Sequence, residues 1–255
     1  MDIKGSTIIV TGGASGLGEA CIRRCVQKGA TAAIFDFDAD RGKAVASELG
    51  DAVIFCKIDV SDPDAVQSGI DKVVETLGAV HVVINCAGVA TPMKVVGKKG
   101  PLNMDQFNRV IQINLIGTMT VLSRAAEKMA ANPPNADGEK GVVINVASIA
   151  AFEGQIGQAA YSASKAGVAG MTLPVAREFA DYGIRVMTIA PGLFETPMMA
   201  GLPDTVKASL ANSIPFPKRL GRPEEFADLA LHIIENPLLN GETIRLDAAV
   251  RMAAR

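Results

Sequence analysis

The chain has 255 residues, 49% of them hydrophobic, and its 25 Lys and Arg against 27 Asp and Glu give a formal net charge of −2. This length and apolar content predict a globular protein with a substantial core, and the charge gives no support for nucleic-acid binding. Apolar stretches are too short to span a bilayer, so no membrane partner is expected. Because Met1 runs almost directly into an apolar strand, we expect no signal or transit peptide and a cytoplasmic location.

Short apolar runs rich in β-branched residues recur along the chain, and segments of helical period lie between them. The runs predict seven strands, at residues 7–10, 32–35, 53–58, 80–84, 142–146, 184–189 and 243–246. This alternation is typical of βαβ units, and strands apolar on both faces fit a parallel sheet with helices on each side. Residues 132–138 are interpreted as a surface turn after a long helix. The sequence therefore predicts one doubly wound α/β domain over residues 1–255, with ligands at the carboxyl ends of the strands.

A glycine-rich turn follows the first strand, in the run Thr11-Gly12-Gly13-Ala14-Ser15-Gly16-Leu17-Gly18. Glycines permit a tight turn and let backbone N–H groups approach a pyrophosphate at the N-terminus of the next helix. We expect that helix to begin near Glu19. A turn with a purely structural role is the alternative.

Asp36 ends the second strand, 18 residues after Gly18. A carboxylate at this place is expected to bind the adenosine ribose hydroxyls of a dinucleotide. It would repel the 2′-phosphate of NADP by about 1 to 4 kcal/mol, so NAD is the expected cofactor. The alternative is that Asp36 or Asp38 caps the following helix.

Tyr161 and Lys165 are four residues apart, which places them on one face of a helix. A tyrosine has an ordinary pKa of about 10, and a neighbouring ammonium stabilises the phenolate. The pair is therefore a candidate acid/base device. Because this spacing is also common on exposed helix faces, the interpretation depends on the other motifs.

The four cysteines, Cys21, Cys25, Cys56 and Cys86, show no CxxC spacing. Cys21 and Cys25 are four apart on an expected helix, but no His lies near them in the sequence, so no metal site is expected. We expect the cysteines to be small buried hydrophobic residues in a reducing compartment. His81 and His232 fall in no motif and are expected to be structural.

The motifs and their order resemble those of the short-chain dehydrogenases/reductases. The shared motifs are the run from Thr11 to Gly18, Asn85-Cys86-Ala87-Gly88, Asn114, Ser148, Tyr161 with Lys165, and Pro191-Gly192. This resemblance spans nearly the whole chain and implies a Rossmann-type sheet of seven mostly parallel strands and, usually, a homotetramer. By motif position it implies that NAD is bound by Gly12, Ser15, Gly16, Leu17, Gly18, Asp36, Asp59, Val60, Cys86, Ala87, Gly88, Tyr161, Lys165, Pro191, Phe194 and Thr196. The chain departs from the family at Cys86, where the usual motif has Asn.

The resemblance also implies the catalytic roles. Alcohol oxidation requires a group that takes the hydroxyl proton, a group that holds the oxygen and a nicotinamide that accepts the hydride. Tyr161 is expected to be the base and Ser148 to hydrogen-bond the oxygen, while Lys165 lowers the pKa of Tyr161 and holds the ribose. For Ser148 the alternative is a buried serine that caps the next turn. Asn114 interrupts an apolar helix at 110–116, and it is expected to hold a water beside Lys165, with a local helix distortion as the alternative.

Four further segments narrow the resemblance to one branch of the family, the type II 3-hydroxyacyl-CoA dehydrogenases, also called type 10 17β-hydroxysteroid dehydrogenases. These are residues 151–160, 171–174, 190–194 and 236–241, and they include Pro174 within a helix. Members of this branch oxidise the 3-hydroxyl of an acyl-CoA with NAD, and some accept steroids or branched acyl chains. The implied reaction is oxidation of 3-hydroxyacyl-CoA to 3-oxoacyl-CoA, with Ser148, Gln155 and Tyr161 contacting the substrate.

Two segments agree with an acyl-CoA substrate. Leu193, Phe194, Met198, Met199 and Leu202 form an apolar segment that could cover an acyl chain, with ordinary packing as the alternative. Lys98 and Lys99 in the loop 91–102 could meet a CoA phosphate, with a solvated loop as the alternative. The run Asp247-Ala248-Ala249 departs from the glycine-containing turn common in the family, which leaves the geometry of the pocket floor open.

Other functions remain as alternatives. A hydroxysteroid or other secondary-alcohol dehydrogenase would use the same reacting groups. A 3-oxoacyl carrier-protein reductase would use NADPH, which Asp36 disfavours. A cofactor-binding scaffold in a larger complex is the non-enzyme alternative, and the intact set of Ser148, Tyr161 and Lys165 argues against it.

Overall fold

The strands of the chain build one parallel sheet. In the computed structural model, which describes residues 1–98, 100–201 and 203–254, seven strands of the described part pair in the order β3-β2-β1-β4-β7-β8-β9. Each neighbouring pair in this sheet is parallel. The strands are β1 Thr7–Thr11, β2 Thr31–Asp36, β3 Val53–Lys57, β4 Val82–Asn85, β7 Gly141–Val146, β8 Ile184–Pro191 and β9 Thr243–Leu246. The seven predicted strands are confirmed, with ends displaced by at most two residues.

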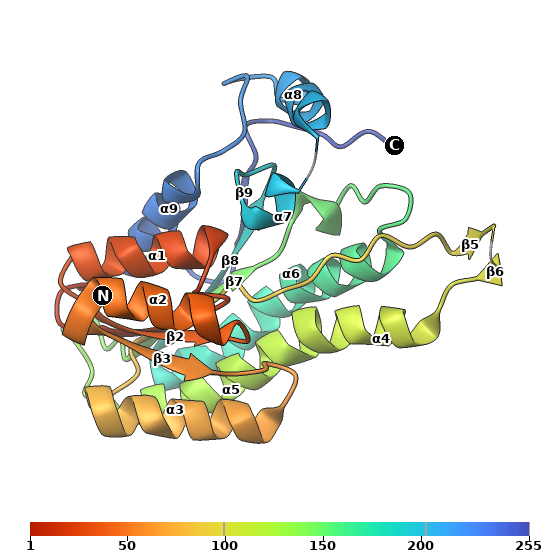
Figure 1. The fold of residues 1–255 in the computed structure, drawn as a ribbon. Coiled ribbons are helices and arrows are strands. Elements are labelled where there is room, and N and C mark those ends of the chain that lie inside the picture. The colour runs from red at the N-terminus through yellow and green to blue at the C-terminus, as the bar shows by residue number, and fades with distance from the viewer. Residues whose placement is uncertain (99, 202, 255) are drawn as a thin grey trace.

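Helices cover both faces of this sheet (Figure 1). They are α1 Gly16–Gln27, α2 Ala39–Leu49, α3 Pro63–Leu77, α4 Met104–Ile111, α5 Gly117–Met129, α6 Ala159–Phe179, α7 Pro197–Ala200, α8 Asp204–Ser213 and α9 Pro223–Glu235. Side chains alternate between the faces along β1. Ile8 and Val10 therefore pack in a core with α1, α2 and α9, whereas Ile9 packs in a second core with α3, α5 and α6. The predicted α/β fold with a doubly wound sheet is confirmed.

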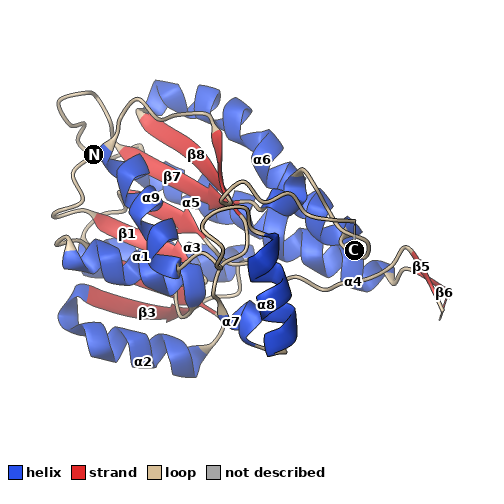
Figure 2. Ribbon diagram, turned by 90° about the horizontal axis from the view of Figure 1, so that it is seen from above, coloured by secondary structure: helices blue, strands red, loops and turns tan. Residues whose placement is uncertain are grey.

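The strand order reverses between β1 and β4. From β1 the chain proceeds outward to β3 on one side, and from β4 it proceeds to β9 on the other. The carboxyl ends of β1 and β4 therefore flank the crevice in which open α/β sheets bind their ligands. A small antiparallel hairpin, β5 Val96–Gly97 with β6 Gly100–Pro101, projects from the body of the molecule (Figure 2).

Helix α1 begins earlier than expected, and helix α6 contains Pro174, as expected. Helix α1 begins at Gly16, inside the glycine-rich run, rather than near Glu19. A Cβ on Gly18 would lie 2.2 Å from the carbonyl oxygen of Gly12, so only glycine lets the first helical turn pack this closely on the preceding loop. Helix α6 continues through Pro174, because packing of side chains such as Thr172 and Val175 holds the helix on the sheet despite the lost backbone bond.

Four further expectations concern the turn at 132–138, the cysteines, membrane-spanning helices and the location of the protein. The turn at 132–138 does follow helix α5, as predicted. All four cysteines are free, and three of them are buried, as expected for small hydrophobic residues; burial raises the pKa of Cys25 to about 12. Among the helices of the described residues, none is long and apolar enough to cross a membrane. The cytoplasmic location stays a prediction.

Candidate active site

The glycine-rich turn after β1 lies against the turn after β4. Gly12 has a φ of +64°, and a Cβ there would lie 3.0 Å from the backbone of Ala87. The hydroxyl of Thr11 accepts a hydrogen bond from the Ala87 N–H at 3.1 Å. Ser15 is the N-cap of α1, yet its side chain makes no capping bond. The first N–H groups of α1 are therefore available to an anion in this crevice.

Asp36 faces this turn from the end of β2. Its two carboxylate oxygens accept hydrogen bonds from the backbone N–H groups of Ala14 and Asp38, each at 3.0 Å. The N-cap of α2 is Asp38, which accepts from the N–H of Arg41 at 3.1 Å. The capping alternative therefore applies to Asp38 and not to Asp36.

Two clefts meet at the β1–α1 turn. The first, of about 380 Å³, reaches Tyr161, and its lining includes Gly12, Ser15, Gly16, Leu17, Gly18, Cys86, Ala87, Gly88, Lys165, Pro191, Phe194 and Thr196. The second, of about 310 Å³, includes Asp36, Asp59 and Val60, and it shares Gly12, Ala87 and Gly88 with the first. Together the two clefts are lined by all sixteen residues expected to bind the cofactor. Contact with a cofactor stays a prediction.

Ser148 lies near Tyr161, which lines the first cleft. Burial raises the pKa of Tyr161 above its ordinary value, and the hydrogen bond with Ser148 opposes this increase. The Ser148 Oγ also accepts the N–H of Ala150 at 3.1 Å and thereby caps the short turn Ile149–Ala151. Because that oxygen accepts from Ala150, the serine hydrogen remains free to donate toward the phenol oxygen. The capping role that the sequence offered as the alternative for Ser148 is observed, and its catalytic role stays a prediction.

Lys165 lies beneath Tyr161 on α6. Its Nζ is 5.8 Å from the centroid of the Tyr161 ring and donates to the carbonyl of Val146 at 2.8 Å. Burial lowers the pKa of Lys165 to about 8, from an ordinary value of 10.5. Burial raises the pKa of Tyr161, and the expected lowering of that pKa by the Lys165 ammonium stays a prediction.

The lowered pKa of Lys165 predicts that the free energy of unfolding increases with pH in the alkaline range. Between pH about 8 and 10.5 the folded protein has lost the Lys165 proton while the unfolded chain still holds it, so unfolding takes up a proton. The free energy of unfolding of wild type should therefore increase with pH relative to a Lys165→Met variant, by at most about 1.4 kcal/mol per pH unit. Urea unfolding of both proteins at pH 7, 8, 9 and 10 measures this difference. Parallel curves would show that the ammonium is not destabilised by burial.

Asn114 sits in a widened helical turn. A π-helical segment, Gln112–Ile116, joins α4 to α5, and such turns are frequent at functional sites. The Asn114 side chain accepts the Val89 N–H at 2.8 Å and donates to the Val89 carbonyl and the Ser164 hydroxyl at 2.9 and 3.0 Å. A Cβ on Gly88 would lie 3.2 Å from Asn114 Oδ1 and 3.4 Å from Lys165 Nζ. The predicted helix distortion is present, and it brings this amide and the ammonium to the same glycine.

Phe194 is buried, and it also lines the first cleft. The residue is only 6% exposed and its ring meets the Phe226 ring edge-on at a centroid distance of 6.3 Å, while Leu193 packs against Ile214 and Leu220. Ordinary packing, the alternative for this segment, is therefore observed for Phe194, and the cover for an acyl chain stays a prediction. Met199 does line the first cleft. The Met198 side chain, Leu202 and Lys99 lie outside the described residues, and Lys98 is exposed in the turn between β5 and β6.

A neighbouring cleft of about 650 Å³ lies beside the one that holds Tyr161, and Gln158 lines both. Gln155 lines this neighbouring cleft, but its side-chain amide donates to the Ala253 carbonyl at 3.0 Å. The sequence did not single out Lys94, Val95 or Val96, which form the opposite wall. The sequence signal that could have indicated this wall is the apolar pair Val95-Val96 within the loop 91–102. Both side chains are exposed in the structure.

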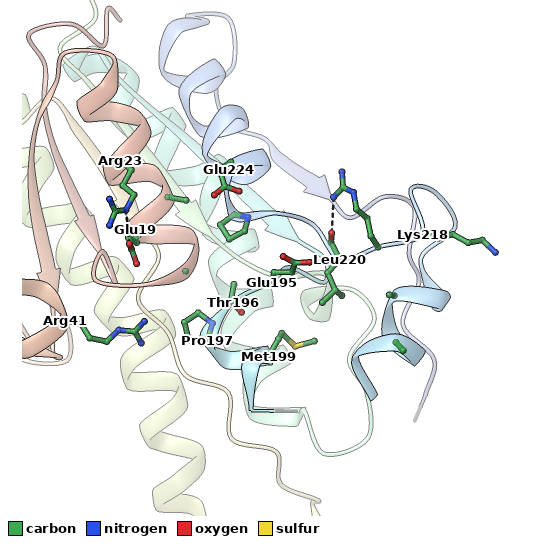
Figure 3. Close-up of a pocket in the computed structure, with 16 residues that line it drawn as sticks. Glu19, Arg23, Arg41, Glu195, Thr196, Pro197, Met199, Lys218, Leu220 and Glu224 are labelled. Carbon is green, nitrogen blue, oxygen red and sulfur yellow. Dashed lines mark hydrogen bonds and ion pairs between the residues drawn. The ribbon is translucent and has the colours of Figure 1, made fainter. Parts of the chain in front are cut away.

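A larger cleft, of about 760 Å³, opens on the other side of α7 and is lined by charges of both signs (Figure 3). Glu19 and Arg23, bonded to each other at 2.9 Å, form one wall, and Thr196 and Pro197 form another. Tyr161, Lys165 and Ser148 do not line it, so it lacks the acid/base groups. No cluster of three or more His, Cys, Asp or Glu that could hold a metal occurs within 1–98, 100–201 and 203–254.

The chain is similar to known proteins over almost its whole length. A family model described as "short chain dehydrogenase" matches residues 6–207. A 3-hydroxyacyl-CoA dehydrogenase type-2 of Drosophila melanogaster is 51% identical over 252 residues, which cover 98% of this chain and 99% of that protein. The crystal structure of 3-hydroxyacyl-CoA dehydrogenase type-2 from Mycobacterium avium has a TM-score of 0.93 and 42% identity, with 98% of each chain covered. A 3-ketoacyl-(acyl-carrier-protein) reductase from Brucella melitensis, solved in complex with NADH, has a TM-score of 0.87 and 26% identity, with 97% of this chain and 98% of that chain covered.

Proposed function

Because the chain belongs to the short-chain dehydrogenase family, we propose that it oxidises the 3-hydroxyl of a 3-hydroxyacyl-CoA to the 3-oxo group with NAD as hydride acceptor. The observation that carries the proposal is one cleft lined both by Tyr161 with Lys165 and by the glycine-rich turn, a lining that fits a dinucleotide. The 51% identity to a 3-hydroxyacyl-CoA dehydrogenase type-2 over nearly both full lengths supports the substrate class.

The residues present fit a nicotinamide dinucleotide. Gly12 packs closely on the Ala87 backbone and lines both clefts, so a pyrophosphate in them would lie against the backbone of the glycine-rich turn. The uncapped N-terminus of α1 would hold that group, and the Asp36 carboxylate would hold the adenosine ribose. Asp59 and Val60 would flank the adenine.

When bound, the nicotinamide supplies a hydride acceptor and a positive charge. Deprotonated Tyr161 would take the proton of the substrate hydroxyl, and Ser148 would donate its hydrogen to the same oxygen. Burial raises the pKa of Tyr161, so the enzyme needs a nearby positive charge before the phenol loses its proton near neutral pH. Lys165 supplies one such charge while its pKa of about 8 keeps it largely protonated at pH 7.

Asn114 would complete the proton path. Its Nδ2 already donates two hydrogen bonds, whereas its Oδ1 accepts only one and retains a second acceptor position. We propose that this oxygen, near Gly88 and Lys165, holds a water that connects the ammonium to solvent.

Substrate preference tests the proposal directly. Initial rates of NAD reduction should be compared for 3-hydroxybutyryl-CoA, longer 3-hydroxyacyl-CoAs and a 17β-hydroxysteroid. We expect the highest kcat/KM with an acyl-CoA. A higher kcat/KM with the steroid would show that the substrate is a steroid and not an acyl-CoA. No turnover with any of these compounds would favour the scaffold alternative.

Asp36 tests the choice of NAD over NADP. Removing its charge in Asp36→Ala should raise relative NADP affinity by about five- to several-hundred-fold, which corresponds to about 1 to 4 kcal/mol of lost repulsion. Asp38→Ala is the matched control, because it removes the neighbouring carboxylate that caps α2. Titration of both cofactors into each variant measures the selectivity. Unchanged NAD over NADP selectivity in Asp36→Ala would refute the assignment.

We also propose that the chain forms a homotetramer, as the resemblance to its family implies. Exposed apolar side chains on the outer faces of α5 and α6, such as Met119 and Leu173, support a contact between copies along these helices. Light scattering after size-exclusion chromatography measures the assembly, and a monomer at micromolar concentration would contradict it.

A further inference from the structure

An ion cluster joins the C-terminal segment to the loop that follows Ser148. Glu153 lies in this loop and accepts from Arg245 of β9 with both carboxylate oxygens, at 2.7 and 3.2 Å. Arg251 lies 3.1 Å from the same carboxylate. Asp247 contacts both arginines, at 2.7 Å for Arg245 and 3.2 Å for Arg251. We call these four residues, two anions and two cations in mutual contact, the C-terminal ion cluster.

Backbone contacts extend this connection. The N–H of Met252 donates to Glu153 at 3.3 Å, the side chain of Gln155 donates to the Ala253 carbonyl at 3.0 Å, and the Ile156 N–H donates to the Ala254 carbonyl at 3.1 Å. The end of the described chain therefore lies along the loop at 153–156. Hydrogen bonding by Arg245 lowers the pKa of Glu153, which keeps this carboxylate ionised at neutral pH.

The turn between β9 and Arg251 is strained. Ala248 and Ala249 have φ values of +49° and +63°, in the left-handed region that side chains other than glycine disfavour. Such a conformation persists only where surrounding contacts determine it. Here it reverses the chain so that Arg251 and Met252 reach Glu153, which indicates that the cluster holds the turn in place.

The loop at 152–156, which the C-terminal ion cluster contacts, forms one wall of the cleft next to the one that Tyr161 lines. Phe152 packs under the Arg245 guanidinium at 5.4 Å from its ring centroid, and its ring is 52% exposed. Phe152, Gln155 and Ile156 line the cleft of about 650 Å³ that adjoins the Tyr161 cleft at Gln158. The N–H groups of Phe152 and Glu153 both donate to the Ile149 carbonyl at 3.0 Å, so the loop continues directly from the turn that Ser148 caps.

The members of the cluster differ in exposure. The Arg251 side chain is 59% exposed, so its ion pairs contribute little to folding, whereas Arg245, Glu153 and Asp247 are at most 25% exposed and form a network that also stabilises the fold. A small displacement of groups that position a substrate, by contrast, costs much more in activity than in stability.

We propose that the C-terminal ion cluster is a positioning device that holds Phe152 and the following loop as a fixed wall for the acyl-CoA. The proposal rests on the proposed function for the identity of this ligand. Glu153, Arg245 and Arg251 are positioning residues, and they do not touch the reacting atoms. Gln155, expected from the sequence to contact substrate, belongs to the same device through its bond to Ala253.

Glu153→Gln tests the device, because it removes the charge while keeping the shape of the side chain. We expect KM for 3-hydroxybutyryl-CoA to rise about tenfold, with kcat changed less and NAD affinity unchanged. Glu153→Asp, which keeps the charge, should recover most of the loss. The matched control is Glu48→Gln, which removes a similar two-bond contact with Arg23, at 2.7 and 2.7 Å, far from this loop. The control should leave KM unchanged, and thermal melts should show that every variant is folded.

Hydrogen exchange gives a readout that does not depend on the substrate. Amides at 152–156 should exchange faster in Glu153→Gln than in wild type, and at the wild-type rate in Glu48→Gln. Unchanged exchange in Glu153→Gln would overturn the proposal. If wild type does oxidise the acyl-CoA, an unchanged KM in Glu153→Gln would also overturn it. If wild type oxidises no acyl-CoA, the proposed function fails by itself, and the exchange rates still decide whether the cluster holds the loop.

Discussion

Replacing Tyr161 with phenylalanine is expected to lower turnover by about a hundredfold or more while leaving NAD binding nearly intact. The variant loses only the hydroxyl that would take the substrate proton, and its ring still packs over Lys165. A hundredfold loss corresponds to about 2.7 kcal/mol of transition-state stabilisation. Single-turnover rates of NAD reduction measure the chemical step, and NAD titration measures the binding.

The chain supplies its own control for this experiment. Tyr182 is the only other tyrosine in the sequence and is exposed at the end of α6, so Tyr182→Phe removes the same atom outside the clefts. We expect wild-type turnover in that variant. Near-normal turnover in Tyr161→Phe would eliminate the phenol as the base.

Sequence patterns predicted the parts of the molecule that depend on local chemistry. Each strand was detectable because a parallel sheet covered on both faces requires a short, continuous apolar run. Asp36 was detectable because the end of the strand after a glycine turn is where a ribose-binding carboxylate must lie. The helix that begins at Gly16 was placed too late, because the glycines that signal a turn here also permit the first turn of α1 to pack closely on it.

Contacts between distant parts of the chain were not predictable in this way. Glu153 and Arg245 are 92 residues apart, and nothing in either neighbourhood signals the other. The contact of Gln155 with substrate stays a prediction, and the sequence around Gln155 did not signal the bond of its side-chain amide to Ala253. The packing of the Phe194 ring against Phe226 is another contact that the sequence around Phe194 did not specify.

A buried ion pair at the other end of the sheet also joins residues that are far apart in the sequence. Arg185 on β8 donates through Nε to Glu139 at 2.6 Å, and its other nitrogens donate to the carbonyls of Ile233, Ile234 and Leu239 at 2.8 Å. The amino group of Met1 lies 2.8 Å from the second Glu139 oxygen. Arg185 thus satisfies the last carbonyls of α9, where a cation is also favoured by the helix dipole, and Glu139 compensates its charge.

Glu139→Gln is therefore expected to lower the free energy of unfolding by about 3 to 5 kcal/mol, because it leaves a buried guanidinium without its counter-ion. Side chains on both sides of the pair are less than one-tenth exposed, so water cannot replace the lost carboxylate. Urea unfolding at one fixed protein concentration measures the change, since assembly would otherwise shift the midpoint. Glu48→Gln, which removes an exposed partner of an arginine that keeps Glu19, should unfold close to wild type. If the Glu139 variant is also close to wild type, the Arg185 charge is compensated by the α9 carbonyls alone, and the ion pair does not hold α9 against the sheet.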